Sequence, residues 1–294
     1  MTNITAIIVT YNSAGVVGEA LASLKAQPQI ARIIVVDNAS QDKCCAFVST
    51  HFPDVLLVRN EKNLGFGMGN NMALPQVETE FALLVNPDAV LQPGAVEALL
   101  AAAARYSEAG ILAPRLFYED GSGQPSHKTS LFQREQCRAP YIEPEGDLCA
   151  EFLSGALWLV RIDALHKTGY FDPEIFFYYE DDDLCLRMRK AGYSLVLVND
   201  AHAVHGMGKS SAPSPDSRRF RLYHDIWSRL YIEYKYRGRE AAQRMIVHKY
   251  WRYRLWRLTS IPSLVGRYGP RLQAVKDFMA YLESMHSAIR GDKR

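Results

Sequence analysis

Short apolar runs alternate with helix-like stretches through the first hundred residues of this chain. The runs consist almost entirely of Val, Ile, Leu, Ala and Phe, without the alternating polar residues of a strand that faces water on one side. Such runs, separated by helices, are typical of a parallel sheet covered by helices on both faces. The sequence therefore predicts an α/β fold. The expected strands are 5–10, 32–37, 55–59 and 81–86, and the expected helices lie near 15–26, 41–50, 67–74 and 93–105.

The pattern changes twice further along the chain. Residues 110–160 are rich in loops and short strands, and they are followed by an expected helix at 181–191 and two expected strands, YSLVLV and AHAVH. After the small-residue stretch at 207–217, which is typical of a loop or linker, apolar residues recur at the three- and four-residue spacing of an amphipathic helix. We therefore expect an α/β domain at 1–216 and a helical C-terminal region at 217–294.

Charge is distributed unevenly between these two regions. The C-terminal region holds 18 Lys and Arg against 6 Asp and Glu, a balance of +12, which leaves −10 for residues 1–216. The segment HKYWRYRLWRL (248–258) interleaves Trp and Tyr with basic residues, which suits an anionic membrane surface. Alternatively, these aromatic residues pack against the α/β domain or a second subunit in an oligomer. Nucleic acid is not expected as a partner, because no recognition motif accompanies the charge.

Composition argues against several other classes of protein. No window approaches the roughly 18 apolar residues of a membrane-spanning helix. The start MTNITAIIVTYN lacks the basic residues and long apolar run of a secretory signal, so a cytoplasmic location is expected. The five cysteines form no C-x-x-C pair, which argues against a disulfide framework or a structural zinc site.

Polar residues follow four of the expected strands, at the sheet edge where α/β proteins bind ligands. A single Asn or Asp at such a place could simply make a turn or cap a helix, but four sets together favour a binding site. The sets are Thr10, Tyr11 and Asn12; Asp37 and Asn38; Asn60 and Asn63; and Asn86 with Asp88.

The motif NLGFGMGNN (63–71) is only weakly similar to a dinucleotide-binding fingerprint. It follows the third strand instead of the first, and Asn70 stands where the third glycine belongs. Glycines such as Gly67 could let the backbone approach a nucleotide or a neighbouring strand closely, and a flexible helix entry is the alternative.

Asp88 and His205 are candidate ligands of a divalent cation. Asp88 follows a buried strand and Pro87, and Mg²⁺ or Mn²⁺ at such a carboxylate keeps coordination sites for water and phosphate. His205 ends the expected strand AHAVH, where His202 is an equally placed competitor. A lone histidine can also be purely structural.

The segment FFYYEDDDLCLR (176–187) runs four aromatic residues into four acids. Acids in the first turn of a helix offset the positive end of its macrodipole, which accounts for one or two of the four. Burial of a further carboxyl group against the aromatic rings would raise its pKa, as a general base acting near neutral pH requires. The aromatic rings could also stack on a sugar. The segment therefore indicates a catalytic site.

Taken together, these blocks resemble the family 2 glycosyltransferases of the GT-A fold, and within them the rhamnosyltransferase-like branch. The resemblance covers roughly residues 3–210. It rests on seven ordered motifs: IIVTYNS, IIVVDNASQD, NEKNLGFGMGNN, LLVNPDA, FLSGALWLVR, FDPEIFFYYEDDDLCLRMRKAGY and HAVHGMGKSS.

The resemblance implies roles for individual residues. Asp181 would be the catalytic base, and Asp88 of the D-x-D motif would hold Mg²⁺ or Mn²⁺ together with His205. Asn86 replaces the first acid of D-x-D, which removes one negative charge from the metal site. The donor side would comprise Thr10, Tyr11, Asn12, Asp37, Asn38, Asn63, Gly67, Asn70, Asn86 and Asp88, and the acceptor side Glu180, Gly155 and Trp158.

The expected reaction is an inverting transfer of a sugar from a nucleotide donor, dTDP-L-rhamnose or a related deoxyhexose nucleotide. The acceptor would be a glycan or lipid-linked sugar of the bacterial surface, reached from the cytoplasmic face of the inner membrane. Lys209 could close over the diphosphate. A sugar nucleotidyltransferase is one rival, although VTYNSAGVVGE offers no basic residue for a triphosphate. A non-catalytic glycan- or nucleotide-binding module is another, and the presence of both Asp88 and Asp181 argues against it.

Overall fold

The structure is a computed structural model that describes residues 3–128, 144–206, 208, 215–257 and 262–291. Within it the chain forms two compact units. Unit 1 comprises Met1–Pro173 and Glu180–Ala212, and unit 2 comprises Glu174–Tyr179 and Pro213–Arg294. Lys209 lies outside the described residues.

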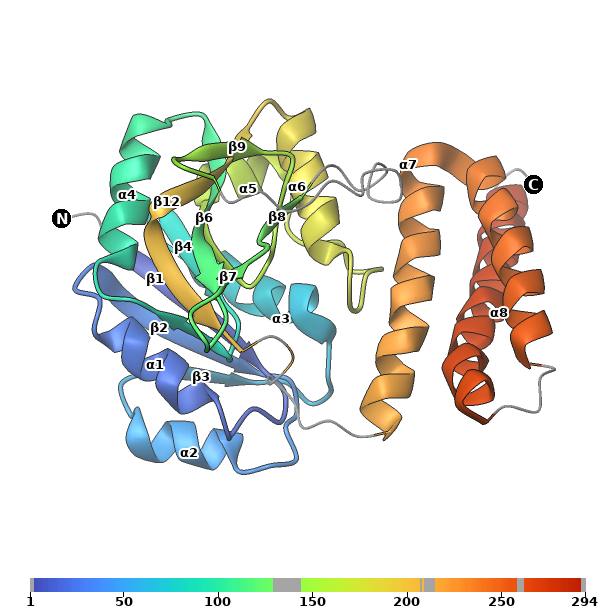
Figure 1. Ribbon diagram of the computed structural model, residues 1–294, viewed down its shortest axis with the longest axis horizontal. Coiled ribbons are helices and arrows are strands. Elements are labelled where there is room, and N and C mark those ends of the chain that lie inside the picture. Colours follow the sequence, from blue (N-terminus) through green and yellow to red (C-terminus); the bar gives the residue numbers. More distant parts are fainter. Residues whose placement is uncertain (1–2, 129–143, 207, 209–214, 258–261, 292–294) are drawn as a thin grey trace. The chain divides into compact units, whose positions relative to one another are not determined.

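Unit 1 is built on one large mixed sheet (Figure 1). Its strands are β1 (Ile4–Thr10), β2 (Ile30–Asp37), β3 (Leu56–Arg59), β4 (Phe81–Val85), β5 (Ala89–Leu91), β6 (Ala109–Phe117), β7 (Gly123–Gln124), β9 (Leu148–Ala150), β11 (Leu157–Arg161) and β12 (Ser194–His205). The order is β3-β2-β1-β4-β11-β6-β12-β5, with β7 beside β6 and β9 beside β12. A separate pair is formed by β8 (His127–Lys128) and β10 (Phe152–Leu153).

Most strands of the central path run parallel to one another. Neighbours are parallel from β3 through β4 and again between β6 and β12, whereas β11 is antiparallel to both β4 and β6. The chain order β1, β2, β3, β4 with intervening helices explains the parallel half, because each crossover returns the chain to the same edge of the sheet. The carboxyl ends of β1, β2 and β4 therefore share one edge.

Helices cover both faces of the sheet (Figure 1). One face buries residues of three helices, including Leu21, Val48 and Leu99, and the other face buries residues such as Leu165 and Leu184. The first group is α1 (Val17–Lys25), α2 (Cys44–His51) and α4 (Ala95–Arg105), and the second is α3 (Gly65–Ala73), α5 (Ile162–Thr168) and α6 (Glu180–Lys190). A 3-10 turn (Leu74–Gln76) follows α3. The predicted α/β fold with a mostly parallel sheet is confirmed.

The structure differs from the sequence-based prediction in two places. Helix α5 was not predicted, because its seven residues are too few to show a helical period. The expected strands YSLVLV and AHAVH form the single strand β12, whose register with β6 shifts between Val198 and His202. The polar residues Asn199 and Asp200 lie in this irregularity, so they interrupt the apolar pattern without ending the strand.

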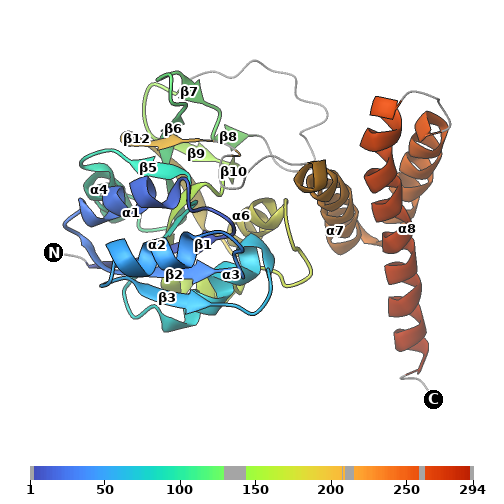
Figure 2. The ribbon, with the colours of Figure 1, turned by 90° about the horizontal axis from the view of Figure 1, so that it is seen from below.

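Unit 2 is helical, as the C-terminal sequence pattern predicts. It consists of α7 (Pro215–Arg257) and α8 (Pro262–Gly291), which lie against each other (Figure 2), and α7 is kinked at Gly238, whose φ is 82°. Aromatic rings line the contact between the two helices, for example Trp227 against Phe278 at 5.6 Å between ring centroids. Ser217, where we expected the second region to begin, lies within the first turn of α7. No described helix is long and apolar enough to cross a membrane.

Candidate active site

The carboxyl ends of β1 and β2 carry a buried polar cluster. The register places Thr10 beside Asp37, and the Thr10 hydroxyl donates to the Asp37 carboxylate at 3.0 Å. The hydroxyl and backbone N–H of Ser40 donate to the same carboxylate at 2.5 and 3.0 Å. Asp37 is only 1% exposed, and these three hydrogen bonds offset the cost of burying it. Tyr11 follows at the surface. The cluster presents an oriented acceptor group at the sheet edge.

Asn12 and Asn38 shape the loops beyond these two strands. Asn12 has a φ of 54°, a left-handed conformation that Asn adopts more readily than most residues, and its N–H donates to Ser40 Oγ at 2.8 Å. The Asn38 side chain donates to the Gly65 carbonyl at 2.9 Å and accepts from Asn60 at 2.8 Å. Asn38 therefore connects β2 to the start of α3. Both asparagines stabilise loop conformations, which was the alternative to a ligand-binding role for these positions.

Close approach of α3 to its neighbours explains two glycines of the NLGFGMGNN motif. A Cβ atom at Gly69 would lie 2.6 Å from Val9 Cγ1, and one at Gly67 would lie 2.9 Å from Phe171 Cβ. Real Cβ atoms essentially never make contacts this short. These glycines therefore allow α3 to pack beside the polar cluster.

Asn63 and Asn70 stabilise the same helix. The Asn63 side chain accepts the N–H of Gly65 at 2.9 Å, at the start of α3. Asn70 is buried and donates to the carbonyl of Phe66 at 3.0 Å, whereas its side-chain oxygen has no hydrogen-bond partner among the described residues. Because this oxygen is buried, Asn70 supports α3 from within in this conformation and does not present the oxygen to a ligand in solvent.

Asn86, Asp88 and His205 come together beyond β4, β5 and β12. His205 Nε2 lies 3.6 Å from Asp88 Oδ1 and 3.4 Å from Asn86 Nδ2. His205 Nδ1 lies 2.9 Å from Gln124 Oε1. Because an amide oxygen only accepts hydrogen bonds, Nδ1 carries a proton in this contact, and Nε2 is the ring nitrogen that faces Asp88.

This group fits a divalent cation. It offers one carboxylate oxygen, from Asp88, and one imidazole nitrogen, from His205. Gln124 accepts a hydrogen bond from the other ring nitrogen of His205, as residues next to metal-bound histidines commonly do. Within the described ranges, no cluster of three or more His, Cys, Asp and Glu side chains is placed to hold a metal ion, so this group would supply two such protein ligands. Asp88 and His205 would therefore leave coordination positions to water and to phosphate oxygens. His202 instead bonds the Asn199 carbonyl at 2.9 Å, so His205 is the better placed of the two histidines.

The four acids at the start of α6 have different surroundings. Asp183 is fully buried and pairs with Arg187 at 2.8 Å. Glu180 is 8% exposed, and desolvation, followed by the charge of Asp181, raises its pKa well above the usual value for Glu. Asp181 is half-buried and accepts the N–H of Asp182 at 2.9 Å and that of Gly155 at 3.3 Å. Glu180 is thus the carboxyl group in this run whose pKa is shown to rise.

Asp181 and Asp88 are connected through the sheet. The residue after Gly155 is Ala156, whose carbonyl accepts the N–H of Asn86 at 2.9 Å. The adjacent residues Gly155 and Ala156 therefore link the Asp181 carboxylate to the backbone of Asn86, two residues before Asp88. The expected base and the expected metal ligands lie at one edge of the sheet.

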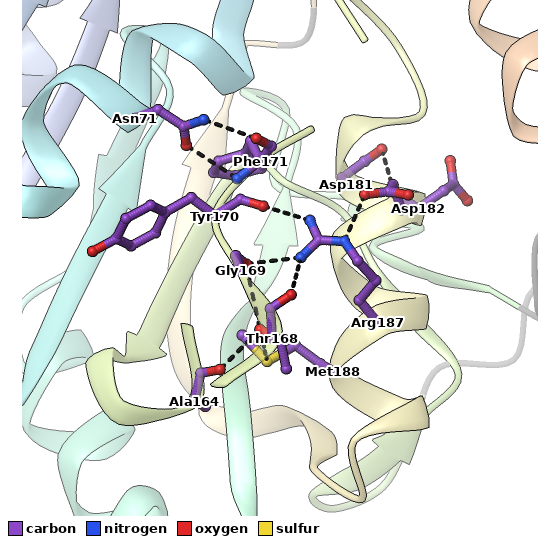
Figure 3. Close-up of polar contacts among 11 residues, drawn as sticks. Asn71, Ala164, Thr168, Gly169, Tyr170, Phe171, Asp181, Asp182, Arg187 and Met188 are labelled. Atoms are coloured by element: carbon purple, nitrogen blue, oxygen red, sulfur yellow. Dashed lines mark hydrogen bonds and ion pairs between the residues drawn. The ribbon is translucent and has the colours of Figure 1, made fainter. Parts of the chain in front are cut away.

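A hydrogen-bonded loop joins α3 to α6 beside this site (Figure 3). The Arg187 guanidinium donates to the carbonyl oxygens of Thr168, Gly169 and Tyr170 at 2.7–2.8 Å. Further along the same loop, the side chain of Asn71 exchanges two hydrogen bonds with the backbone of Phe171, at 2.8 and 3.0 Å.

Trp158 is placed differently from the other expected acceptor-side residues. It is 0% exposed in β11, and its ring lies parallel to that of Phe171 at 6.4 Å between centroids. Its indole N–H has no hydrogen-bond partner among the described residues. In this conformation Trp158 supports the site by packing and cannot touch a ligand in solvent.

Comparison with known proteins identifies the family. The sequence profile described as "Glycosyl transferase family 2" matches residues 5–169. The chain belongs to this family. It is 30% identical to an N-acetylglucosaminyl-diphospho-decaprenol L-rhamnosyltransferase of Mycobacterium tuberculosis, over 74% of this chain and 80% of that protein. It is 24% identical to the rhamnosyltransferase WbbL of Escherichia coli K12, over 68% and 81% of the two chains.

The fold agrees with this membership. The structure of the mannosyltransferase PcManGT of Pyrobaculum calidifontis in complex with GDP-Man and Mn²⁺ superposes with a TM-score of 0.55 at 17% identity, covering 97% of this chain and 75% of that one. The GT-A fold expected from the sequence motifs is confirmed, and the chain is a glycosyltransferase.

Sequence reasoning missed several residues that shape the site: Ser40, Asn71, Gln124 and Arg187. Ser40 follows Asp37 within an Asn-Ala-Ser turn, and this local signal could have revealed it. The partners of Asn71 and Gln124 lie 100 and 81 residues away in the chain, so no local pattern marks them.

Proposed function

We propose that the chain catalyses inverting transfer of a deoxyhexose, L-rhamnose, from dTDP-L-rhamnose to a glycan or lipid-linked acceptor in surface polysaccharide synthesis. The observation that carries the proposal is the short connection from Asp181 through Gly155 and Ala156 to Asn86 and Asp88. It puts a half-buried carboxylate and a carboxylate–imidazole pair on one sheet edge. The names of two relatives support rhamnose as the transferred sugar.

In the proposed reaction, Asp181 takes the proton of an acceptor hydroxyl while that oxygen bonds to the anomeric carbon. The bond from this carbon to the diphosphate oxygen breaks in the same step, and the nucleoside diphosphate leaves with the bonding electrons. The N–H groups of Gly155 and Asp182 hold the carboxylate in one orientation. Asp37 and its hydroxyl donors would bind the nucleoside.

Asp88 and His205 would hold Mg²⁺ or Mn²⁺. The ion, when bound, would stabilise the negative charge that develops on the leaving diphosphate. Asn86 supplies an amide beside His205 where the family motif has an acid. We therefore expect weaker metal binding than a site with two carboxylates would show.

Replacement of Asp181 by Asn tests the base directly. We expect turnover to fall by about 10²–10⁴-fold, the range of general base catalysis, with donor affinity retained. Nucleoside diphosphate release measures turnover, and the thermal shift with dTDP-rhamnose measures donor binding. Turnover within twofold of the wild type would refute the assignment.

A thermal-shift panel of nucleotide sugars, with and without Mn²⁺, tests the donor. A ligand at about 100 times its Kd should stabilise the folded chain by about 2.7 kcal/mol. We expect dTDP-L-rhamnose to give the largest shift, and Mn²⁺ to increase it. An equal or larger shift with UDP-sugars or GDP-mannose would overturn the donor assignment.

The proposed acceptor is reached at an anionic membrane, on the cytoplasmic face of the inner membrane. Val247, Trp251 and Leu255 recur every four residues of α7 and are 57%, 55% and 63% exposed, with Arg252 and Arg254 interspersed. Apolar residues on one helix face with flanking arginines suit the headgroup region of anionic lipid.

Flotation with vesicles that contain anionic lipid tests this surface. Replacement of both Trp251 and Leu255 by Ser should abolish flotation, whereas Met279→Ser, an exposed apolar side chain on α8, should leave it unchanged. Equal flotation of both variants would contradict the membrane assignment.

A further inference from the structure

The loop immediately before the proposed base packs within the helical unit. The rings of Phe176 and His224 stack at 4.8 Å between centroids with an interplanar angle of 28°. Phe220 meets Phe176 edge-on at 5.4 Å and lies 4.3 Å from His224. These three rings form one aromatic cluster, in which Phe176 comes from the loop and the other two come from α7.

A buried hydrogen bond fixes the next residue of the loop. The hydroxyl of Ser228, which is 0% exposed, donates to the backbone carbonyl of Phe177 at 2.8 Å. Phe220, His224 and Ser228 are spaced four residues apart, so they lie along one face of α7. One face of this helix therefore holds both the ring of Phe176 and the backbone of Phe177.

The turn that follows is strained. Tyr178 and Tyr179 have φ values of 64° and 69°, in the left-handed region that bulky residues rarely adopt. Such conformations persist only where the surroundings enforce them. Glu180 and Asp181 come directly after this turn and begin α6. The direction in which the chain enters α6 thus depends on a turn that must be held in place.

We propose that α7 acts as a positioning element for the catalytic base, through Ser228 and His224. Ser228 holds the carbonyl of Phe177 and His224 holds the ring of Phe176, and together they enforce the Tyr178–Tyr179 turn from which Asp181 starts. Both are positioning residues, because they act through the loop and not on the reacting atoms. This inference rests on the proposed role of Asp181.

The His224 ring acts by stacking. Its Nδ1 atom is buried and has no hydrogen-bond partner among the described residues. A phenyl ring should therefore replace it, whereas a methyl group should not. The hydroxyl of Ser228, by contrast, acts by donating a hydrogen bond, which Ala cannot do.

The test compares four variants of the full chain. We expect Ser228→Ala and His224→Ala to lower kcat by about 3- to 30-fold while KM and Kd for the nucleotide sugar stay within twofold, since misplacement by 1 Å can cost about 10²-fold. His224→Phe should keep kcat near the wild-type value. The matched control is Ser284→Ala, which removes another hydroxyl-to-carbonyl hydrogen bond in α8, at 2.8 Å, and should not change kcat.

The outcomes separate this inference from the proposed function. Folded Ser228→Ala and His224→Ala variants with wild-type kcat would refute the positioning role, while a loss of turnover in Asp181→Asn would still support the base. A rise in KM at constant kcat would also refute it, because that pattern indicates lost substrate binding. If His224→Ala does not fold, Ser228→Ala and His224→Phe decide the question, and a His224→Phe enzyme as slow as Ser228→Ala refutes the stacking role.

Discussion

Gly155→Ala should impair the enzyme by moving the Asp181 carboxylate. A Cβ atom at Gly155 would lie 3.1 Å from Asp181 Cβ and 3.7 Å from its Oδ2 atom. Carbon atoms at optimal separation lie about 3.5–4.0 Å apart, so the side chain of Asp181 must retreat by about half an ångström. If 1 Å of misplacement costs about 10²-fold, this shift should lower kcat by about 10-fold. KM for the nucleotide sugar should not change, because the donor-side residues are untouched.

Steady-state release of nucleoside diphosphate measures the effect, with thermal unfolding as the check on folding. Crowding by the new Cβ atom should lower the free energy of unfolding by about 1–3 kcal/mol. Alanine also restricts the unfolded chain more than glycine does, which offsets about 0.4–1 kcal/mol of this loss. Gly146→Ala is the matched control, because a Cβ atom there meets nothing within 4 Å. A folded Gly155→Ala enzyme with kcat equal to that of Gly146→Ala would refute the geometric reasoning.

Three further predictions concern buried polar groups. Gln124→Leu should leave the Nδ1–H of His205 without its acceptor and weaken Mn²⁺ binding by about 10- to 100-fold in a calorimetric titration, whereas Gln124→Glu should retain most of the affinity. Glu180→Gln should have a higher Tm than the wild type above pH 4.5, the usual pKa of Glu, and the same Tm below it. The reason is that the pKa of Glu180 is raised in the folded chain, so wild-type stability falls as the pH rises above 4.5, whereas Gln does not ionise. Burial lowers the pKa of His224 to about 4, so between about pH 6.5 and 4 the unfolded chain binds a proton that the folded chain does not. As the pH falls through this range, the free energy of unfolding should decrease by about 1–2 kcal/mol, a value discounted for partial solvent exposure. In His224→Phe the thermal unfolding should lose this pH dependence, and an unchanged pH profile would contradict the prediction.

The sheet was predictable because its strands are buried on both faces. Burial on both faces leaves a continuous apolar run, which is visible in one sequence without any comparison. Helix α5 could not be predicted in this way, since seven residues are too few to show a helical period. The continuity of β12 could not be predicted either, because the polar pair Asn199–Asp200 has the composition of a turn. Residues 174–179 were expected within 1–216, but the structure groups them with the helical unit through the contacts of Phe176 and Phe177.

The grouping of the candidate-site residues could be predicted where these residues lie at strand ends. Asp37 and His205 are the last residues of β2 and β12, and Asp88 lies between β4 and β5, so the sheet brings them to one edge. The residues that orient them are set by tertiary contacts, such as the 81-residue separation between Gln124 and His205. The role of Trp158 depends on its burial, which a strand pattern cannot distinguish from a place in a pocket.

The Arg187 contacts with the loop after α5 have a consequence for how freely this part of the chain can vary. The guanidinium recognises three carbonyl oxygens, which every amino acid supplies, and no side chain of residues 168–170 enters these contacts. Substitution of Tyr170 should therefore leave these hydrogen bonds intact, although its ring also packs against the core and His166, while Gly169, with a φ of 82°, and Arg187 itself should resist change. In a mutational scan, Gly169 and Arg187 should therefore stand out as intolerant positions, and they would mark the anchor of α6.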